Sequence, residues 1–238
     1  MSPFMMSDPL YPVIFGVAAV LSLIAQFRVK SSFAKWSKVG NYRNMSGAEA
    51  AAKMLASEGV TDVRILRQQS GFLSDNFNPG EKTINLSPDV YDGRSIAAVG
   101  VACHEAGHAL QHADGYAPLK LRSAIIPVVT IGNQFGLPMV VLGAGLGWMG
   151  LATIGFILFS TMFLFQLITL PAEIDASVRS KNALVANRIV QPGPEADGVS
   201  SVLTAAAFTY IAAAVGSLLT LLYHAYRLGL IGGRSRND

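Results

Sequence analysis

The sequence predicts a mainly α-helical integral membrane protein with about four transmembrane helices and a small α+β segment. Charged residues make up 14% of the 238 positions, against roughly 25% in an ordinary soluble domain. Residues 9–27, 123–172 and 198–226 contain no Asp, Glu, Lys or Arg. Uncharged, mostly apolar runs of about 18 residues or more are typical of membrane-spanning helices. The middle stretch is long enough for two of them.

The distribution of charge divides the chain into five segments. They are an N-terminal transmembrane anchor (1–27), a polar segment (28–122), a transmembrane helical hairpin (123–172), a helix and loop (173–201), and a C-terminal transmembrane helix and tail (202–238). Lys and Arg flank the polar segment at both ends, which the positive-inside rule expects of a cytoplasmic segment. These flanks explain the basic balance without nucleic acid. We therefore expect a multi-pass protein of the cell (inner or plasma) membrane, in contact with the lipid bilayer.

Local signals predict the elements of the polar segment. Ser46-Gly-Ala-Glu49 is a capping box that opens a helix over 48–57, and Gly59 occupies the position of a C-cap glycine. We expect residues 60–66 and 83–86 to form a hairpin around the turn at Asn78-Pro-Gly-Glu81. Residues 83–86 could then offer a strand edge to an extended peptide, and a role as structural scaffold is an equal alternative.

Ser95 begins a second helix, Ile96–Ala113, which Asp114-Gly115 ends and which contains His104-Glu-Ala-Gly-His108. Two histidines four residues apart lie on one helical face, so both imidazoles can reach one zinc ion. The intervening Glu105 can take a proton from the water bound to that ion. Gly107 disfavours a helix interior by up to about 1 kcal/mol, which suggests a backbone kept clear.

A catalytic zinc usually has three protein ligands. His112 lies about 12 Å from His104 along the helix axis, too far for one tetrahedral site. Glu173 directly follows the uncharged block 123–172, and two spans return the chain to the same side of the membrane. We therefore expect Glu173 to be the third ligand, the alternative being an acid favoured at an interfacial helix N-terminus. Asp175 is a candidate to orient a ligating imidazole, and a purely structural role is an equal alternative.

These residues carry a resemblance. His104-Glu-Ala-Gly-His-Ala-Leu-Gln-His112, Leu170-Pro-Ala-Glu-Ile-Asp-Ala-Ser177 and Ala205–Ala213 are similar to segments of the YugP-type family of bacterial membrane zinc metallopeptidases. The layout resembles that of the HtpX and CAAX-protease membrane metallopeptidases. The resemblance implies a zincin-like, gluzincin-type catalytic segment, with zinc bound by His104, His108 and Glu173 and with Glu105 as the base. In one departure, Asp75-Asn-Phe-Asn-Pro79 stands where an Asp-His-Tyr-Asp-Pro-like segment is expected.

The sequence thus predicts a membrane-embedded, zinc-dependent endopeptidase that acts on protein or peptide substrates from the cytoplasmic side. Tyr210 is a candidate oxyanion or substrate contact, although a core aromatic is the simpler interpretation of that position. An oligomer or a membrane partner is compatible with the sequence, and nucleic acid is not expected. The rival class is a non-catalytic membrane scaffold or partner-binding protein that zinc stabilises.

Overall fold

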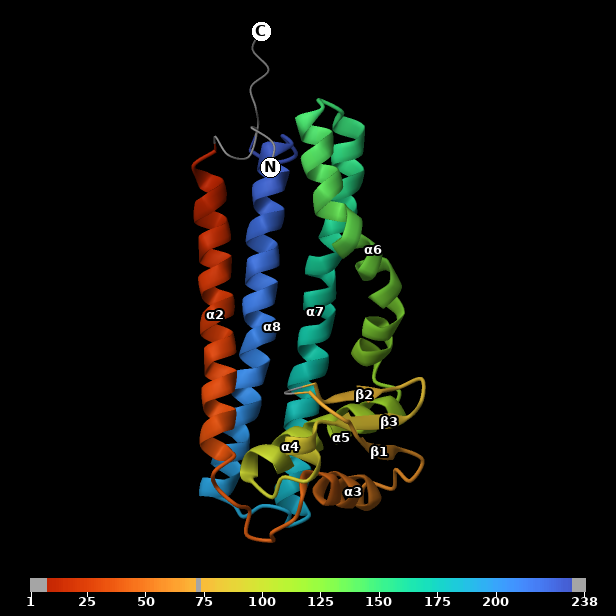
Figure 1. The fold of residues 1–238 in the computed structure, drawn as a ribbon. Coiled ribbons are helices and arrows are strands. Elements are labelled where there is room, and N and C mark those ends of the chain that lie inside the picture. Colours follow the sequence, from red (N-terminus) through yellow and green to blue (C-terminus); the bar gives the residue numbers. More distant parts are fainter. Residues whose placement is uncertain (1–7, 72–73, 233–238) are drawn as a thin grey trace. The chain divides into compact units, whose positions relative to one another are not determined.

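A computed structural model describes residues 8–71 and 74–232, and Figure 1 gives the order of their elements. Four long helices are α2 (Leu10–Trp36), α6 (Ala117–Gly145), α7 (Met149–Ala186) and α8 (Pro194–Arg227). Shorter helices are α3 (Gly47–Ser57), α4 (Pro88–Tyr91) and α5 (Ile96–Ala113). Three strands are β1 (Arg64–Arg67), β2 (Asn76–Asn78) and β3 (Thr83–Leu86). The predicted fold class is therefore confirmed.

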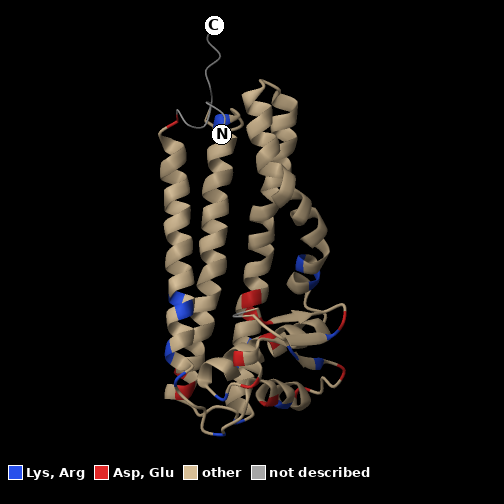
Figure 2. Cartoon of the chain, viewed as in Figure 1, with Lys and Arg blue, Asp and Glu red and all other residues tan. Residues whose placement is uncertain are grey.

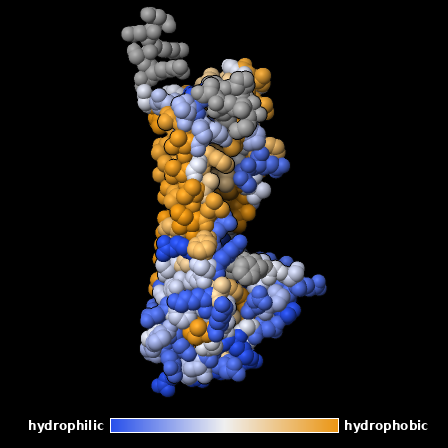
Figure 3. Space-filling model, turned by 60° about the vertical axis from the view of Figure 1, so that its left-hand side comes forward, coloured by the Kyte–Doolittle hydropathy of each residue, from blue (hydrophilic) through white to orange (hydrophobic). Residues whose placement is uncertain are grey.

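Within the described residues, four helices are long and apolar enough to cross a membrane, and they are α2, α6, α7 and α8. In the most hydropathic window of α2, only 6% of the residues are buried inside the protein. An apolar surface of this extent needs a lipid environment. Figure 2 shows long uncharged stretches of these helices, and Figure 3 shows the apolar surface that they present on one face. The chain is thus a multi-pass membrane protein.

The first of two compact units combines Met1–Ile24, Leu121–Thr169 and Tyr210–Asp238. Small residues let its helices approach closely, as is common in membranes. A Cβ atom on Gly143 of α6 would lie 2.3 Å from the main-chain nitrogen of Ala152 in α7. Asp8, just before α2, accepts hydrogen bonds from Tyr223 and, at 2.6 Å, from Arg227 at the end of α8. The beginning of α2 therefore lies beside the end of α8.

The second unit combines Ala25–Lys120 and Leu170–Thr209. Its capping box at Ser46 is confirmed, since Ser46 N donates to Glu49 and Glu49 N donates back to the Ser46 hydroxyl. Gly59 has a φ of 75°, as a C-cap glycine requires. The Ser95 hydroxyl caps α5 by accepting from Ala98 N at 3.1 Å. A buried apolar core includes side chains of α3, β3, α5 and α7, among them Met54, Ile84, Leu86, Val99 and Leu184.

The three strands form one sheet in the order β1-β3-β2. The hairpin predicted between residues 60–66 and 83–86 is wrong in its partner, because β3 pairs antiparallel with β2 and parallel with β1. The predicted turn at Pro79-Gly80 instead joins β2 to β3. Thr83–Leu86 consequently occupies the centre of the sheet, where its main chain is paired on both sides. It offers no edge to a peptide, whereas β2 is an edge strand.

The long helices extend beyond the uncharged stretches of the sequence. Helix α2 continues past residue 27 as far as Trp36, and α8 begins at Pro194, ahead of the uncharged run 198–226. Helix α7 passes through Pro171 without interruption and ends at Ala186. Glu173 therefore lies inside a continuous helix, which fixes its direction relative to the residues one turn away.

Candidate metal centre

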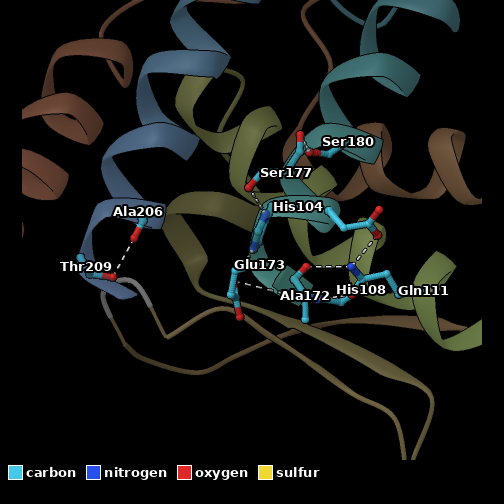
Figure 4. A network of polar contacts seen from close by, with 10 residues as sticks. His104, His108, Gln111, Ala172, Glu173, Ser177, Ser180, Ala206 and Thr209 are labelled. Atoms are coloured by element: carbon cyan, nitrogen blue, oxygen red, sulfur yellow. Dashed lines mark hydrogen bonds and ion pairs between the residues drawn. The ribbon is translucent and has the colours of Figure 1, made fainter. Parts of the chain in front are cut away.

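Helices α5 and α7 bring together three side chains of the type that binds metals. His104, His108 and Glu173 each offer one ligand atom, and these atoms all lie within 4.8 Å of one another. Glu173 and His108 are buried, and His104 is partly buried. Figure 4 shows the two imidazoles of α5 facing the carboxylate of α7. No other group of this kind is found among residues 8–71 and 74–232.

The distances fit a tetrahedral zinc ion. Glu173 Oε2 lies 3.1 Å from His104 Nε2 and 3.5 Å from His108 Nε2. With metal–ligand distances near 2.1 Å, neighbouring ligand atoms of a tetrahedral site are about 3.4 Å apart. Two imidazole nitrogens and one carboxylate oxygen are also a donor set that zinc prefers. The residues present therefore fit this cofactor.

The tautomer of His108 follows from its neighbour Gln111. The Gln111 Nε2 atom donates to the main-chain oxygen of Ala172 at 2.7 Å and to the Asp175 carboxylate at 2.8 Å. Its Oε1 atom, 3.0 Å from His108 Nδ1, must then accept a hydrogen bond from that nitrogen. With the proton on Nδ1, the lone pair of Nε2 faces Glu173 and is available to a metal.

His104 has a comparable partner on α7. The Ser177 hydroxyl lies 3.2 Å from His104 Nδ1, on the opposite side of the ring from Glu173. Ser177 follows Glu173 by one helical turn, so both side chains project from one face of α7 toward α5. This arrangement directs Nε2 of His104 toward the same carboxylate oxygen.

Gly107 allows α5 and α7 to approach this closely. A Cβ atom at this position would lie 2.6 Å from the main-chain oxygen of Ala176, well inside van der Waals contact. The clear backbone that the sequence suggested for Gly107 is confirmed. A larger residue would require the backbone at Ala176 to shift.

Glu105 lies on α5 between the two histidines and is 8% exposed. Burial raises the pKa of its carboxyl above the ordinary range of glutamate, although His108 and His104 oppose the shift. Burial acts in the other direction on His108, but the Glu173 carboxylate outweighs it and raises the pKa of that imidazole. Burial also raises the pKa of Asp75, which accepts hydrogen bonds from Ser87 and adds to the negative potential at Glu105.

The remaining candidates occupy different places. Asp175 contacts Gln111 and Arg179, so its link to an imidazole runs through the Gln111 amide. His112 packs against Phe77 of β2, with ring centroids 5.7 Å apart. Tyr210 belongs to the first compact unit, whereas the three-residue group lies wholly in the second. Its contact with substrate stays a prediction.

Sequence reasoning missed two partners of the group, Gln111 and Ser177. Gln111 is fully buried and follows His108 by three positions, so it lies on the same face of α5. A polar residue at this spacing within an apolar helix was the available signal. Ser177 stands four positions after Glu173, and the same periodicity could have identified it.

The fold and this group define a multi-pass membrane protein with a candidate zinc site. The family described as "Putative neutral zinc metallopeptidase" matches residues 11–228. The chain belongs to this family, and zinc is its cofactor. A relative from Bacillus subtilis (strain 168), named "Putative membrane protease YugP", is 43% identical over 227 residues, covering 94% of this chain and 99% of the relative. The resemblance inferred from the motifs is thereby confirmed. No solved structure is a significant match.

Proposed function

We propose that the protein is a zinc-dependent endopeptidase that hydrolyses peptide bonds next to the membrane. In this proposal His104, His108 and Glu173 hold the metal, and residues 28–122 form the catalytic segment. The observation that carries the proposal is the convergence of two Nε2 atoms on one carboxylate oxygen, at 3.1 and 3.5 Å. Three protein ligands leave one position open for water, as in catalytic rather than structural zinc sites.

Bound zinc would supply Lewis-acid chemistry, by activating water as a nucleophile and polarising the scissile carbonyl. Glu105 accepts a proton from the attacking water and passes it to the nitrogen of the leaving amine. Its buried setting and raised pKa favour the first half of that task, because a carboxylate of higher pKa is a stronger base. Gln111 and Ser177 orient the imidazoles and take no part in the proton transfer.

The edge strand β2 is consistent with a substrate that binds as an extended protein or peptide segment. One side of β2 pairs with β3, and Phe77 of the same strand packs against His112 of the motif helix α5. A peptide that adds to the other side of β2 would gain main-chain hydrogen bonds. In this proposal residues 76–78, and not residues 83–86, bind the substrate.

The catalytic segment faces the cytoplasm in this proposal. Three groups of basic residues flank the spans, and these are Arg28 and Lys30, Lys120 and Arg122, and Arg179 to Arg188. An even number of membrane crossings separates one group from the next, so all three lie on the same side, which the positive-inside rule makes the cytoplasm. The ion pair between Asp8 and Arg227 supports a complete crossing by α8, because it fixes the end of α8 beside the beginning of α2. An impermeant thiol reagent in whole cells tests the sidedness, with Ser70→Cys in a Cys103→Ala background. Labelling of this cysteine from outside the cell would show that the topology is the reverse of the one proposed.

Peptide hydrolysis by the purified full-length protein tests the activity. Zinc-loaded protein should cleave an unfolded protein substrate, and a zinc chelator should abolish cleavage until zinc is returned. The alternative, a zinc-stabilised scaffold, predicts no hydrolysis and four protein ligands around the metal. Spectroscopy of cobalt-substituted protein distinguishes a site with an exchangeable water from a closed one.

A further inference from the structure

A polar groove of about 560 Å³ lies between α2 and α8, within the second compact unit. This volume falls within the range of about 300–1,000 Å³ that is usual for small-molecule sites. Two cations, Arg28 and Lys35, line the groove together with Asp197. Five hydroxyl side chains complete its polar wall, and these are Ser31, Ser32, Ser200, Ser201 and Thr204. The lining is therefore rich in hydrogen-bond donors.

The groove lies at the level where both helices pass from uncharged to charged sequence. Arg28 is the first charged residue after the uncharged stretch 9–27, and Asp197 is the last before the stretch 198–226. A hydrogen bond of 3.1 Å between the Ser32 and Ser201 hydroxyls fixes the two helices at this level. Figure 2 shows the change from uncharged to charged ribbon along α2. A groove at such a boundary meets the headgroup region of a bilayer.

Within the part of the chain that the structure describes, the charged side chains of the groove form no ion pair, and these are Arg28, Lys35 and Asp197. The Arg28 guanidinium carbon lies over the ring of Phe208, 5.0 Å from its centroid, a contact that does not neutralise the charge of the guanidinium. Two cations and one carboxylate give the lining a net charge of +1.

We propose that this groove binds the headgroup of an anionic phospholipid. The phosphodiester accepts hydrogen bonds from Arg28, Lys35 and the hydroxyls, and hydroxyls of a glycerol headgroup donate to Asp197. A single negative charge balances the lining, whereas a zwitterionic headgroup leaves one positive charge uncompensated. Basic pockets between transmembrane helices are known to select anionic headgroups. The lipid thereby clamps α2 to α8 at the membrane surface, and this role is independent of peptide hydrolysis.

Native mass spectrometry of delipidated full-length protein tests the proposal. Phosphatidylglycerol and phosphatidylethanolamine are titrated separately, and the bound lipids are counted. One phosphatidylglycerol should bind at least about tenfold more tightly than phosphatidylethanolamine. Arg28→Gln with Lys35→Gln should weaken its binding about 30-fold. The matched control is Lys30→Gln with Lys38→Gln, which removes two neighbouring cations outside the groove and should leave binding within about threefold.

A second variant, Ser201→Tyr, fills the groove without changing its charge and should also weaken phosphatidylglycerol binding by tenfold or more. If the charge variant fails to insert into the membrane, lipid binding by Ser201→Tyr tests the proposal in its place. Equal binding by wild type and both groove variants would overturn the proposal, as would equal affinity for the two lipids. Inorganic phosphate at millimolar concentration should not displace the lipid; displacement would assign the groove to free phosphate.

Discussion

The imidazole of His108 hydrogen-bonds through Nδ1 to the side-chain oxygen of Gln111 at 3.0 Å. The same amide donates to Ala172 and Asp175, the positions immediately before and two after Glu173. One buried side chain of α5 thus ties a histidine of the proposed metal site to the segment of α7 that carries the carboxylate. Metal affinity should depend on this link, because it fixes both the tautomer of His108 and the approach of the two helices.

Replacement of Gln111 tests that dependence. Gln111→Ala should lower zinc affinity about 10- to 100-fold, the usual effect of losing a group that orients a ligand. Zinc affinity is measured by competition with a chelator of known affinity. Gln68→Ala removes an amide that hydrogen-bonds to Ser74, away from the metal centre, and serves as the control. Wild-type affinity in Gln111→Ala would show that packing alone orients His108.

Removal of the proposed third ligand has a larger expected effect. Glu173→Ala should lower zinc affinity more than about 100-fold, since a ligand contributes more than the residue that orients one. Metal analysis of the purified protein gives the stoichiometry. Glu81→Ala removes an exposed carboxylate and should retain one zinc per chain. Full retention by Glu173→Ala would exclude Glu173 as a ligand.

Replacement of the proposed base separates binding from chemistry. Glu105→Gln is nearly isosteric and removes no ligand, so zinc should be retained. Peptide hydrolysis should fall by about 10²- to 10⁴-fold, the range for loss of a general base. Both quantities are measured on one preparation. An unchanged rate of cleavage would assign the proton transfer to another group.

Two glycines of α5 provide a matched pair for the close approach of α5 and α7. Gly107→Ala places a methyl group 2.6 Å from the Ala176 oxygen, whereas Gly100→Ala meets only Val199 at an ordinary 3.4 Å. We expect Gly107→Ala to destabilise the protein by about 1–3 kcal/mol through overpacking. Gly100→Ala should be neutral or slightly stabilising, because alanine favours a helix. Thermal unfolding in detergent measures the difference, and equal melting temperatures would contradict the close contact.

Much of the architecture could be predicted from local sequence. The absence of charge over 9–27, 123–172 and 198–226 determines the membrane-spanning character, because a bilayer interior excludes charged side chains. The spacing of His104 and His108 places both on one face of any α-helix. The capping box at Ser46, the N-cap Ser95 and the glycines Gly59 and Gly115 set the boundaries of α3 and α5. These signals can be found in the sequence because each depends only on residues within one turn.

Tertiary structure decided what depends on segments distant in the chain. Residues 60–66 and 83–86 both have strand character in the sequence. The antiparallel partner of β3 is nevertheless β2, because strand pairing depends on which strands pack on α5. The links from Gln111 to Asp175 and from Ser177 to His104 cross more than 60 residues. They form because Gly107 lets two helices meet at backbone distance. Periodicity fixes which residues share a face of one helix, but only packing decides which face of another helix lies against it.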